Sequence, residues 1–248
     1  MLLVPADPLN PRRVDPHFAA QAGAAREYGV PVARIDHDAL ADPAAAVAGV
    51  PASGAAVYRG WMMTATEYDG FAAALAARGV TLRTSAADYR AAHELPGWYD
   101  TLRDYVKSMK HYWHEAAYVP DVADGSGVER VARRFRELRE DAFAGGFVLR
   151  RFEEFEGAEA RTWWVDGRCA LVTPHPDTPD ELPDGLEIAE LEAVVRGLGL
   201  PFVTVDVVRR ADGAWRVVEL GDGQVSDWPA SQDPAGVVDC LFGDNGPR

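Results

Sequence analysis

Two apolar runs, Phe202–Val208 (FVTVDVV) and Trp215–Leu220 (WRVVEL), decide the fold of this chain. The short interval between them contains Asp212-Gly213, and Asp-Gly between apolar runs is the strongest short-range signal for a β-hairpin. We therefore expect two paired antiparallel strands in the C-terminal part of the chain. Each run is interrupted by one carboxylate, Asp206 in the first and Glu219 in the second.

These two carboxylates can lie opposite each other once the hairpin pairs. Two carboxylates in a partly buried sheet repel each other and stay ionised only if a cation lies between them. Mg²⁺ with a polyphosphate meets this need, because the ion takes one or two carboxylates together with phosphate oxygens. Asp222, in the segment Gly221–Gln224 that follows, adds a third carboxylate on a flexible loop. The alternative is that Asp206 satisfies a backbone group at a bulge and Glu219 reaches solvent.

The stretch Arg103–Trp113 contains both lysines of the chain, Lys107 and Lys110. Two of the 25 basic residues are lysines, so 23 are arginines. A lysine ammonium is a compact point charge on a flexible stem and can follow a moving phosphate. We interpret the pair, beside Arg103, as a candidate polyphosphate site. The alternative is a solvated loop that carries lysine by chance.

The formal net charge of −14 disfavours broad nucleic-acid binding, because that affinity depends on neutralising phosphates with cations. Cys169 and Cys240 are too few and too far apart for a disulfide framework or a zinc site. Cys169 lies in a strand-like run and is expected to act as a small buried hydrophobe. The chain has no apolar run of 18 residues, and its N-terminus does not resemble a signal peptide, so we expect a cytoplasmic protein that does not bind membranes.

Short strands and helices alternate over residues 1–97, which predicts a small parallel α/β domain. Strands are expected at Leu2–Val4, Val30–Ile35, Ala55–Arg59 and Val80–Leu82; helices are expected at 16–29, from the capping box Thr64–Glu67 to Arg78, and from Ser85. Ligands of such domains bind at the carboxyl ends of the strands, where Arg59 lies. The remaining elements predict an α+β layout, with an arginine-rich, solvated helix over 127–141.

Three stretches resemble a clade of small ATP-grasp proteins from actinobacteria and phages: Tyr58–Met62 (YRGWM), Arg103–Ser108 (RDYVKS) and Val218–Ser226 (VELGDGQVS). The resemblance spans nearly the whole chain, and the last stretch is its most specific part. It implies an α/β plus α+β fold in which an N-terminal pre-ATP-grasp domain (1–97) precedes an ATP-grasp domain (98–243). The latter would divide into a lid subdomain (98–150) and a metal-binding subdomain (151–243).

The resemblance also implies roles for single residues. Arg103, Lys107 and Lys110 would bind the phosphates of ATP. A hinge at 150–154 would contact adenine and ribose, with Arg151, Glu153 and Glu154 as candidates.

Glu159 and Arg161 would face the triphosphate, and Arg161 with Lys107 would stabilise the transferring phosphoryl group. Asp206, Glu219 and Asp222 would hold Mg²⁺. Arg59 would bind the substrate carboxylate, together with the basic pair Arg12-Arg13, for which plain surface is the alternative. Trp163 and Trp164 are expected to divide between the core and the cleft.

The implied activity is an ATP- and Mg²⁺-dependent ligase that joins a small-molecule or peptide carboxylate to an amine through an acylphosphate. Two alternatives stay open, a small-molecule kinase and a non-catalytic nucleotide-binding protein. Two departures from the superfamily pattern favour the last alternative. Gly221 stands where the superfamily usually has Asn, and only the short Asp124–Gly127 segment stands in for a long glycine-rich phosphate loop.

Overall fold

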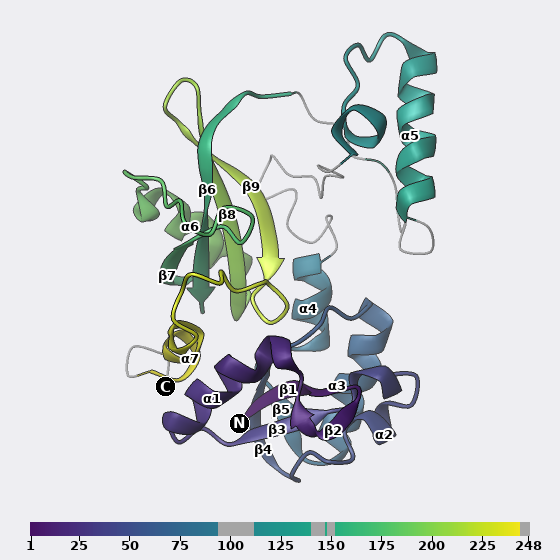
Figure 1. Cartoon of the computed structure of the whole chain (residues 1–248), viewed down its shortest axis with the longest axis vertical. Helices are drawn as coiled ribbons and strands as arrows, with labels where there is room; N and C mark the ends of the chain where they lie inside the picture. Colours follow the sequence, from purple (N-terminus) through teal and green to yellow (C-terminus); the bar gives the residue numbers. More distant parts are fainter. Residues whose placement is uncertain (94–111, 140–146, 148–151, 244–248) are drawn as a thin grey trace. The chain divides into compact units, whose positions relative to one another are not determined.

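The computed structural model describes residues 1–93, 112–139, 147 and 152–243 (Figure 1). The chain forms two compact units. The larger unit comprises Met1–Asp104 and Glu154–Arg248, and the smaller unit comprises Tyr105–Glu153. The smaller unit thus falls within the range expected for the lid subdomain, apart from its last three residues.

The larger unit begins with a five-stranded sheet. Its strands are β1 (Leu2–Asp7), β2 (Asn10–Val14), β3 (Val32–Ile35), β4 (Gly54–Tyr58) and β5 (Val80–Leu82). The four predicted strands pair in parallel in the order β3-β1-β4-β5, as expected for an α/β domain. The sequence analysis missed β2, an antiparallel strand that pairs with the end of β1 where a turn alone was expected.

Helices connect these strands. They are η1 (Pro16–Phe18), α1 (Ala19–Glu27), η2 (His37–Ala39), α2 (Pro43–Ala46), α3 (Ala65–Ala77) and α4 (Ala86–His93). The predicted capping box at the start of α3 is confirmed, because the Thr64 hydroxyl accepts from the Glu67 N–H and the Glu67 carboxylate accepts from the Thr64 N–H. Gly79, with φ of 75°, follows this helix in the left-handed region that glycine tolerates.

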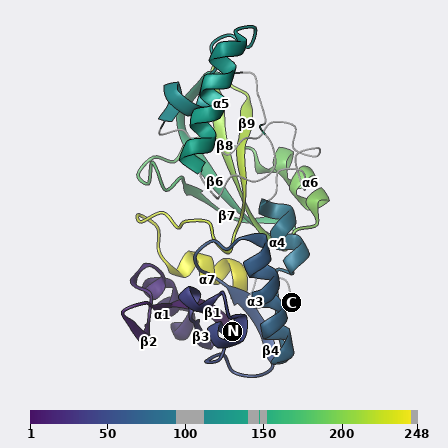
Figure 2. The ribbon, with the colours of Figure 1, turned by 90° about the vertical axis from the view of Figure 1, so that its right-hand side faces the viewer.

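A four-stranded antiparallel sheet forms the rest of the larger unit. Its strands are β6 (Phe155–Val165), β7 (Arg168–Pro174), β8 (Phe202–Arg210) and β9 (Trp215–Asp222), in the order β7-β6-β8-β9. Asp166 and Gly167 both have positive φ, as the predicted Asp-Gly turn between β6 and β7 requires. Helices α6 (Ile188–Leu198) and α7 (Ala235–Phe242) complete the unit, with α6 against β7 and α7 against α1 (Figure 2).

One hydrophobic cluster joins the two sheets. It contains Leu2 of β1, Val57 of β4, Trp163 of β6, Phe202 of β8 and Val237 of α7. The expectation that the neighbouring tryptophans divide between core and cleft needs correction, because Trp163 and Trp164 are both fully buried. Their indole N–H groups donate to Thr173 and Thr162, which satisfies them inside the core.

The described part of the smaller unit contains a π-helical turn η5 (Trp113–Ala117) and the helix α5 (Gly125–Arg139). The Asp124 carboxylate accepts from the backbone N–H and the hydroxyl of Ser126, so the short glycine-containing segment opens a helix. Arg130 and Arg133 are exposed, which confirms the predicted solvated face. Among the helices of the described ranges, none is long and apolar enough to cross a membrane.

Candidate phosphate and metal site

The predicted pairing of the two hairpin carboxylates is confirmed. Asp206 on β8 is the direct partner of Glu219 on β9, and on its other side Asp206 is the direct partner of Arg161 on β6. Directly opposed residues of antiparallel strands place their side chains on the same face, about 5 Å apart. Three charged residues from three strands therefore form one row across the sheet, which we call the β6–β8–β9 row.

Arg161 supplies the cation that the sequence reasoning requires beside Asp206. Its Nε and Nη2 atoms donate to Oδ1 and Oδ2 of Asp206, both at 2.8 Å. Asp206 is 1% exposed and Arg161 is 8% exposed, so this is a buried bidentate ion pair. The alternative reading of Asp206, a carboxylate that satisfies a backbone group at a bulge, is half right: the strand does bulge after Asp206, but the partner is a guanidinium.

The charges of the row shift its titration. Burial alone would raise the pKa of Asp206, but hydrogen bonds and charge from Arg161, and then from His175, hold that pKa below its usual value. Burial alone would lower the pKa of Arg161, but Asp206, Glu219 and Asp227 raise it. Both partners stay ionised at neutral pH, and Glu219 faces the same guanidinium.

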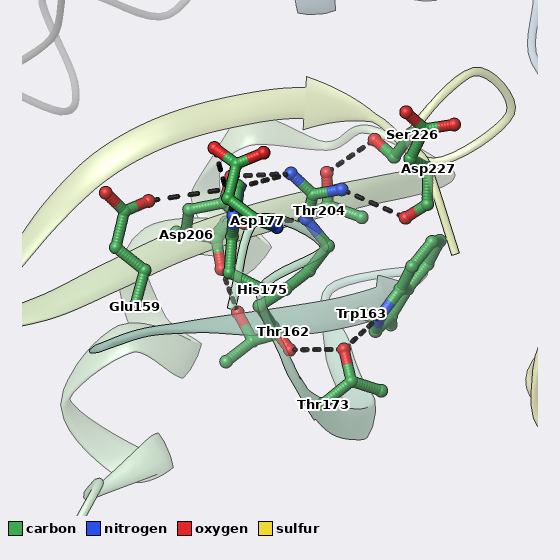
Figure 3. A network of polar contacts seen from close by, with 12 residues as sticks. Glu159, Thr162, Trp163, Thr173, His175, Asp177, Thr204, Asp206, Ser226 and Asp227 are labelled. Atoms are coloured by element: carbon green, nitrogen blue, oxygen red, sulfur yellow. Dashed lines mark hydrogen bonds and ion pairs between the residues drawn. The ribbon is translucent and has the colours of Figure 1, made fainter. Parts of the chain in front are cut away.

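His175, at the end of β7, is a member of the site that the sequence analysis missed (Figure 3). Its Nε2 atom lies 3.5 Å from Asp206 Oδ2 and 3.9 Å from Glu159 Oε2, and one potential ligand atom from each of these three residues lies within 4.8 Å of the others. Nδ1 accepts from the Asp177 N–H at 3.1 Å. In the neutral ring Nε2 then carries the proton, so it faces the two carboxylates as a donor.

The carboxylates of this face fit Mg²⁺. That ion prefers oxygen ligands and usually takes one or two carboxylates, with water and phosphate oxygens completing its shell. After the two hydrogen bonds from Arg161, each Asp206 oxygen retains a lone pair, and Glu219 and Glu159 lie beside it. The donor set is thus suited to a magnesium-bound polyphosphate.

Asp222 does not belong to this group, which corrects its expected place on a flexible loop. It ends β9, is 2% exposed, and accepts from the Gln224 N–H at 2.7 Å. Burial raises its pKa to about 7, although the hydrogen bonds from Gln224 and the charge of Arg59 act in the opposite direction. The metal cluster found in the described ranges does not include it.

This buried carboxyl gives a testable dependence of stability on pH. Because the pKa of Asp222 is higher in the folded chain than in the unfolded chain, stability is expected to fall as pH rises through about 4 to 7, by on the order of 4 kcal/mol. Asp222→Asn cannot ionise and should not show this fall. Urea unfolding of both proteins at pH 5 and pH 8 measures the difference. The exposed Asp184→Asn is the matched control, and equal pH dependence of all three proteins would contradict the assignment.

Arg59 also requires correction, because its guanidinium is occupied inside the larger unit. It is 1% exposed, and it donates to Gln21 Oε1 at 3.0 Å and to the carbonyl oxygens of Gly223 and Ser226 at 2.7 and 2.9 Å. Burial lowers the pKa of Arg59 to about 10, so it remains protonated. Its position is that of a buried link between the loop after β4 and the loop after β9, with no exposed fork for a substrate carboxylate.

The remaining predicted residues divide into two groups. Arg103, Lys107, Lys110 and Arg151 lie outside the described residues. Glu153 ends the smaller unit and is partly buried, whereas Glu154 is exposed and begins the second segment of the larger unit. The basic pair Arg12-Arg13 is exposed on β2.

Solved structures similar to this chain are ATP-grasp proteins. A RimK domain protein ATP-grasp from Sphaerobacter thermophilus aligns with a TM-score of 0.57 at 19% identity, covering 96% of this chain and 98% of its own. The ATP-grasp ligase PsnB, complexed with a minimal precursor, gives 0.54 at 17%, covering 97% and 98%. The D-cycloserine synthetase DcsG gives 0.53 at 15%, covering 96% and 98%. At these identities the similarity establishes the fold alone.

No curated protein matches the chain by sequence. An ATP-grasp domain family, the third family of its clade, matches residues 95–241, which is more than half of the chain and includes the complete β6–β8–β9 row. The resemblance seen in the sequence is therefore confirmed at the level of the family. The chain belongs to this third clade family of ATP-grasp domains.

Proposed function

We propose that this protein is an ATP- and Mg²⁺-dependent ligase that joins a carboxylate to an amine through an acylphosphate. The observation that carries the proposal is the β6–β8–β9 row, in which a buried, ionised Asp206 and a partly exposed Glu219 face one guanidinium. Similar solved structures include the ligase PsnB and the synthetase DcsG, which supports this class of reaction.

Asp206 and Glu219 would hold Mg²⁺, with Glu159 beside them. The ion would neutralise phosphate charge and orient the triphosphate. Arg161 holds Asp206 ionised and fixed in orientation through its two parallel hydrogen bonds. It also adds positive charge where negative charge moves during phosphoryl transfer.

Further residues of the proposed ATP site are carried over from the family pattern. Arg103, Lys107 and Lys110 would bind the phosphates. Arg151, Glu153 and Glu154 would contact the adenosine.

The proposed reaction has two steps. A substrate carboxylate oxygen attacks the γ-phosphorus of ATP, the bond to the β-phosphate oxygen breaks, and ADP leaves. The nitrogen of an amine then attacks the acyl carbon of the acylphosphate, the carbon–oxygen bond breaks, and inorganic phosphate leaves with its electron pair. Phosphoryl transfer depends mainly on alignment and charge neutralisation, which a row of fixed charges can supply.

The test is an incubation of the protein with Mg²⁺, ATP, a pool of the twenty L-amino acids and hydroxylamine. Hydroxylamine traps an acylphosphate as a hydroxamate, so we expect ADP and hydroxamates to appear together by mass spectrometry. A stable phosphorylated amino acid without hydroxamate would instead indicate a kinase. ADP formation no higher than in the blank without amino acids would contradict the proposal.

A further inference from the structure

A second group of polar side chains lies at the switch point of the N-terminal sheet. In the order β3-β1-β4-β5, the chain crosses from one side of β1 to the other between β3 and β4. In open α/β sheets the crevice outside the carboxyl ends of the strands at such a point is where ligands bind. The loop after β4 carries Trp61, and η1, which follows the β1–β2 hairpin, carries His17.

His17, Trp61 and Asp227 form a half-exposed group, which we call the His17 cluster. The His17 Nε2 atom lies 3.2 Å from Asp227 Oδ1, and the imidazole and indole rings lie 4.7 Å apart. Asp15, which is buried, fixes both ring-bearing segments by accepting from the Trp61 indole N–H and from the His17 backbone N–H, each at 2.9 Å. The side chains of His17 and Asp227 are 43% and 64% exposed, and Trp61 is 40% exposed.

The contact with Asp227 determines which nitrogen of His17 can accept a proton. A carboxylate accepts hydrogen bonds, so it selects the tautomer in which Nε2 carries the hydrogen. Nδ1 then bears the lone pair, and among the described residues nothing is bonded to it. The arrangement is a histidine oriented by an acid, with its second nitrogen available, as general bases require.

Asp227 also connects this cluster to the β6–β8–β9 row. Its carbonyl oxygen accepts from Arg161 Nη1 at 3.0 Å, while its carboxylate faces His17 (Figure 3 shows Asp227 beside Asp206 and His175). A single residue therefore lies between the guanidinium of the proposed phosphate site and the imidazole. An acylphosphate formed beside Arg161 would have its acyl carbon within reach of an amine held at the cluster.

We propose that the His17 cluster is the binding site for the amine substrate, and that His17 takes the proton from the attacking amine. The inference rests on the proposed ligase function and names the residues that would select its acceptor. Asp227 and the face of the Trp61 indole would attract a protonated amine, since carboxylates and aromatic faces both bind cations. Exposed Met62 beside Trp61 suits an amine whose neighbouring group is apolar.

The chemistry balances as follows. The bound ammonium loses one proton to solvent and becomes a neutral amine. As its nitrogen bonds to the acyl carbon, the carbon–oxygen bond to phosphate breaks and phosphate leaves with that electron pair. The second proton passes from nitrogen to His17 Nδ1, and Asp227 stabilises the resulting imidazolium before the proton returns to solvent.

The functional test separates the two half-reactions in the amino-acid pool. Hydroxylamine is uncharged at neutral pH and needs no base, so His17→Gln should form hydroxamates within twofold of the wild-type rate. Dipeptide formation without hydroxylamine should fall about 100-fold. Asp227→Asn should behave similarly, because the backbone carbonyl that binds Arg161 is retained. His37→Gln, at the end of β3, is the matched control. Equal loss of both products in His17→Gln, or unchanged dipeptide formation, would overturn the inference.

A binding measurement tests the cluster without turnover. In protein labelled with ¹⁵N-histidine, benzylamine should cause saturable shifts in the His17 ring among the six histidines of the chain. Asp227→Asn should weaken this binding at least tenfold. If hydroxamates do not form but the shifts appear, the ligase proposal fails while the amine site stands. If benzylamine causes no saturable shift at His17, or Asp227→Asn leaves the shift unchanged, the amine site is overturned.

Discussion

Replacing Arg161 with methionine is expected to destabilise the protein by about 3–5 kcal/mol, because Asp206 would remain buried without its partner. The same variant should lose ATP turnover, since the row would lose its fixed positive charge. Urea unfolding at neutral pH, followed by tryptophan fluorescence, measures the first effect. ADP release in the amino-acid pool measures the second.

A double variant separates the two effects. Arg161→Met combined with Asp206→Leu removes both charges, and replacing a buried ion pair with apolar side chains is often neutral in stability. We therefore expect stability to return while turnover stays absent. A single Arg161→Met variant as stable as the wild type would show that the ion pair is not buried as described.

Glu219→Gln is expected to reduce ATP turnover by about 10²–10³-fold with little effect on stability, because it removes one charge that stabilises the transferring group. Glu219 is only partly buried, so its loss leaves no unpaired charge inside the core. The Mg²⁺ concentration for half-maximal ADP release should also rise. Both quantities come from ADP release measured over a magnesium titration.

Glu156→Gln is the matched control for this variant. Glu156 lies on β6 of the same sheet, is exposed, and pairs with Arg209, away from the row. It should keep the wild-type turnover and the wild-type magnesium dependence. If Glu219→Gln behaves like Glu156→Gln, Glu219 is not a metal ligand.

The hairpin of β8 and β9 could be predicted because its signals are local. An Asp-Gly turn fixes the register, and the register alone places Asp206 opposite Glu219. The partner of Asp206 could not be found in the same way. Arg161 is 45 residues away, and the pairing of β6 with β8 passes through an irregular stretch between Glu156 and Ala160 whose offset no local rule sets.

Residues near the ends of strands were the least predictable. Asp222 follows an apolar strand and Arg59 ends one, so both sequences favour an exposed site residue. In the structure the loops after β4 and β9 pack together, and Arg59 donates to carbonyl oxygens of the second loop. Such packing between segments 164 residues apart depends on the whole fold. His17 escaped notice for the same reason, since its partner Asp227 comes from the other end of the chain.

A crystal structure of the protein with Mg²⁺ and a non-hydrolysable ATP analogue tests the central claim most directly. We expect the ion to lie about 2.0–2.1 Å from carboxylate oxygens of Asp206 and Glu219, and to bridge them to the phosphates. Arg161 should keep both hydrogen bonds to Asp206 in that complex. A nucleotide bound elsewhere, with no metal at Asp206 or Glu219, would contradict the assignment.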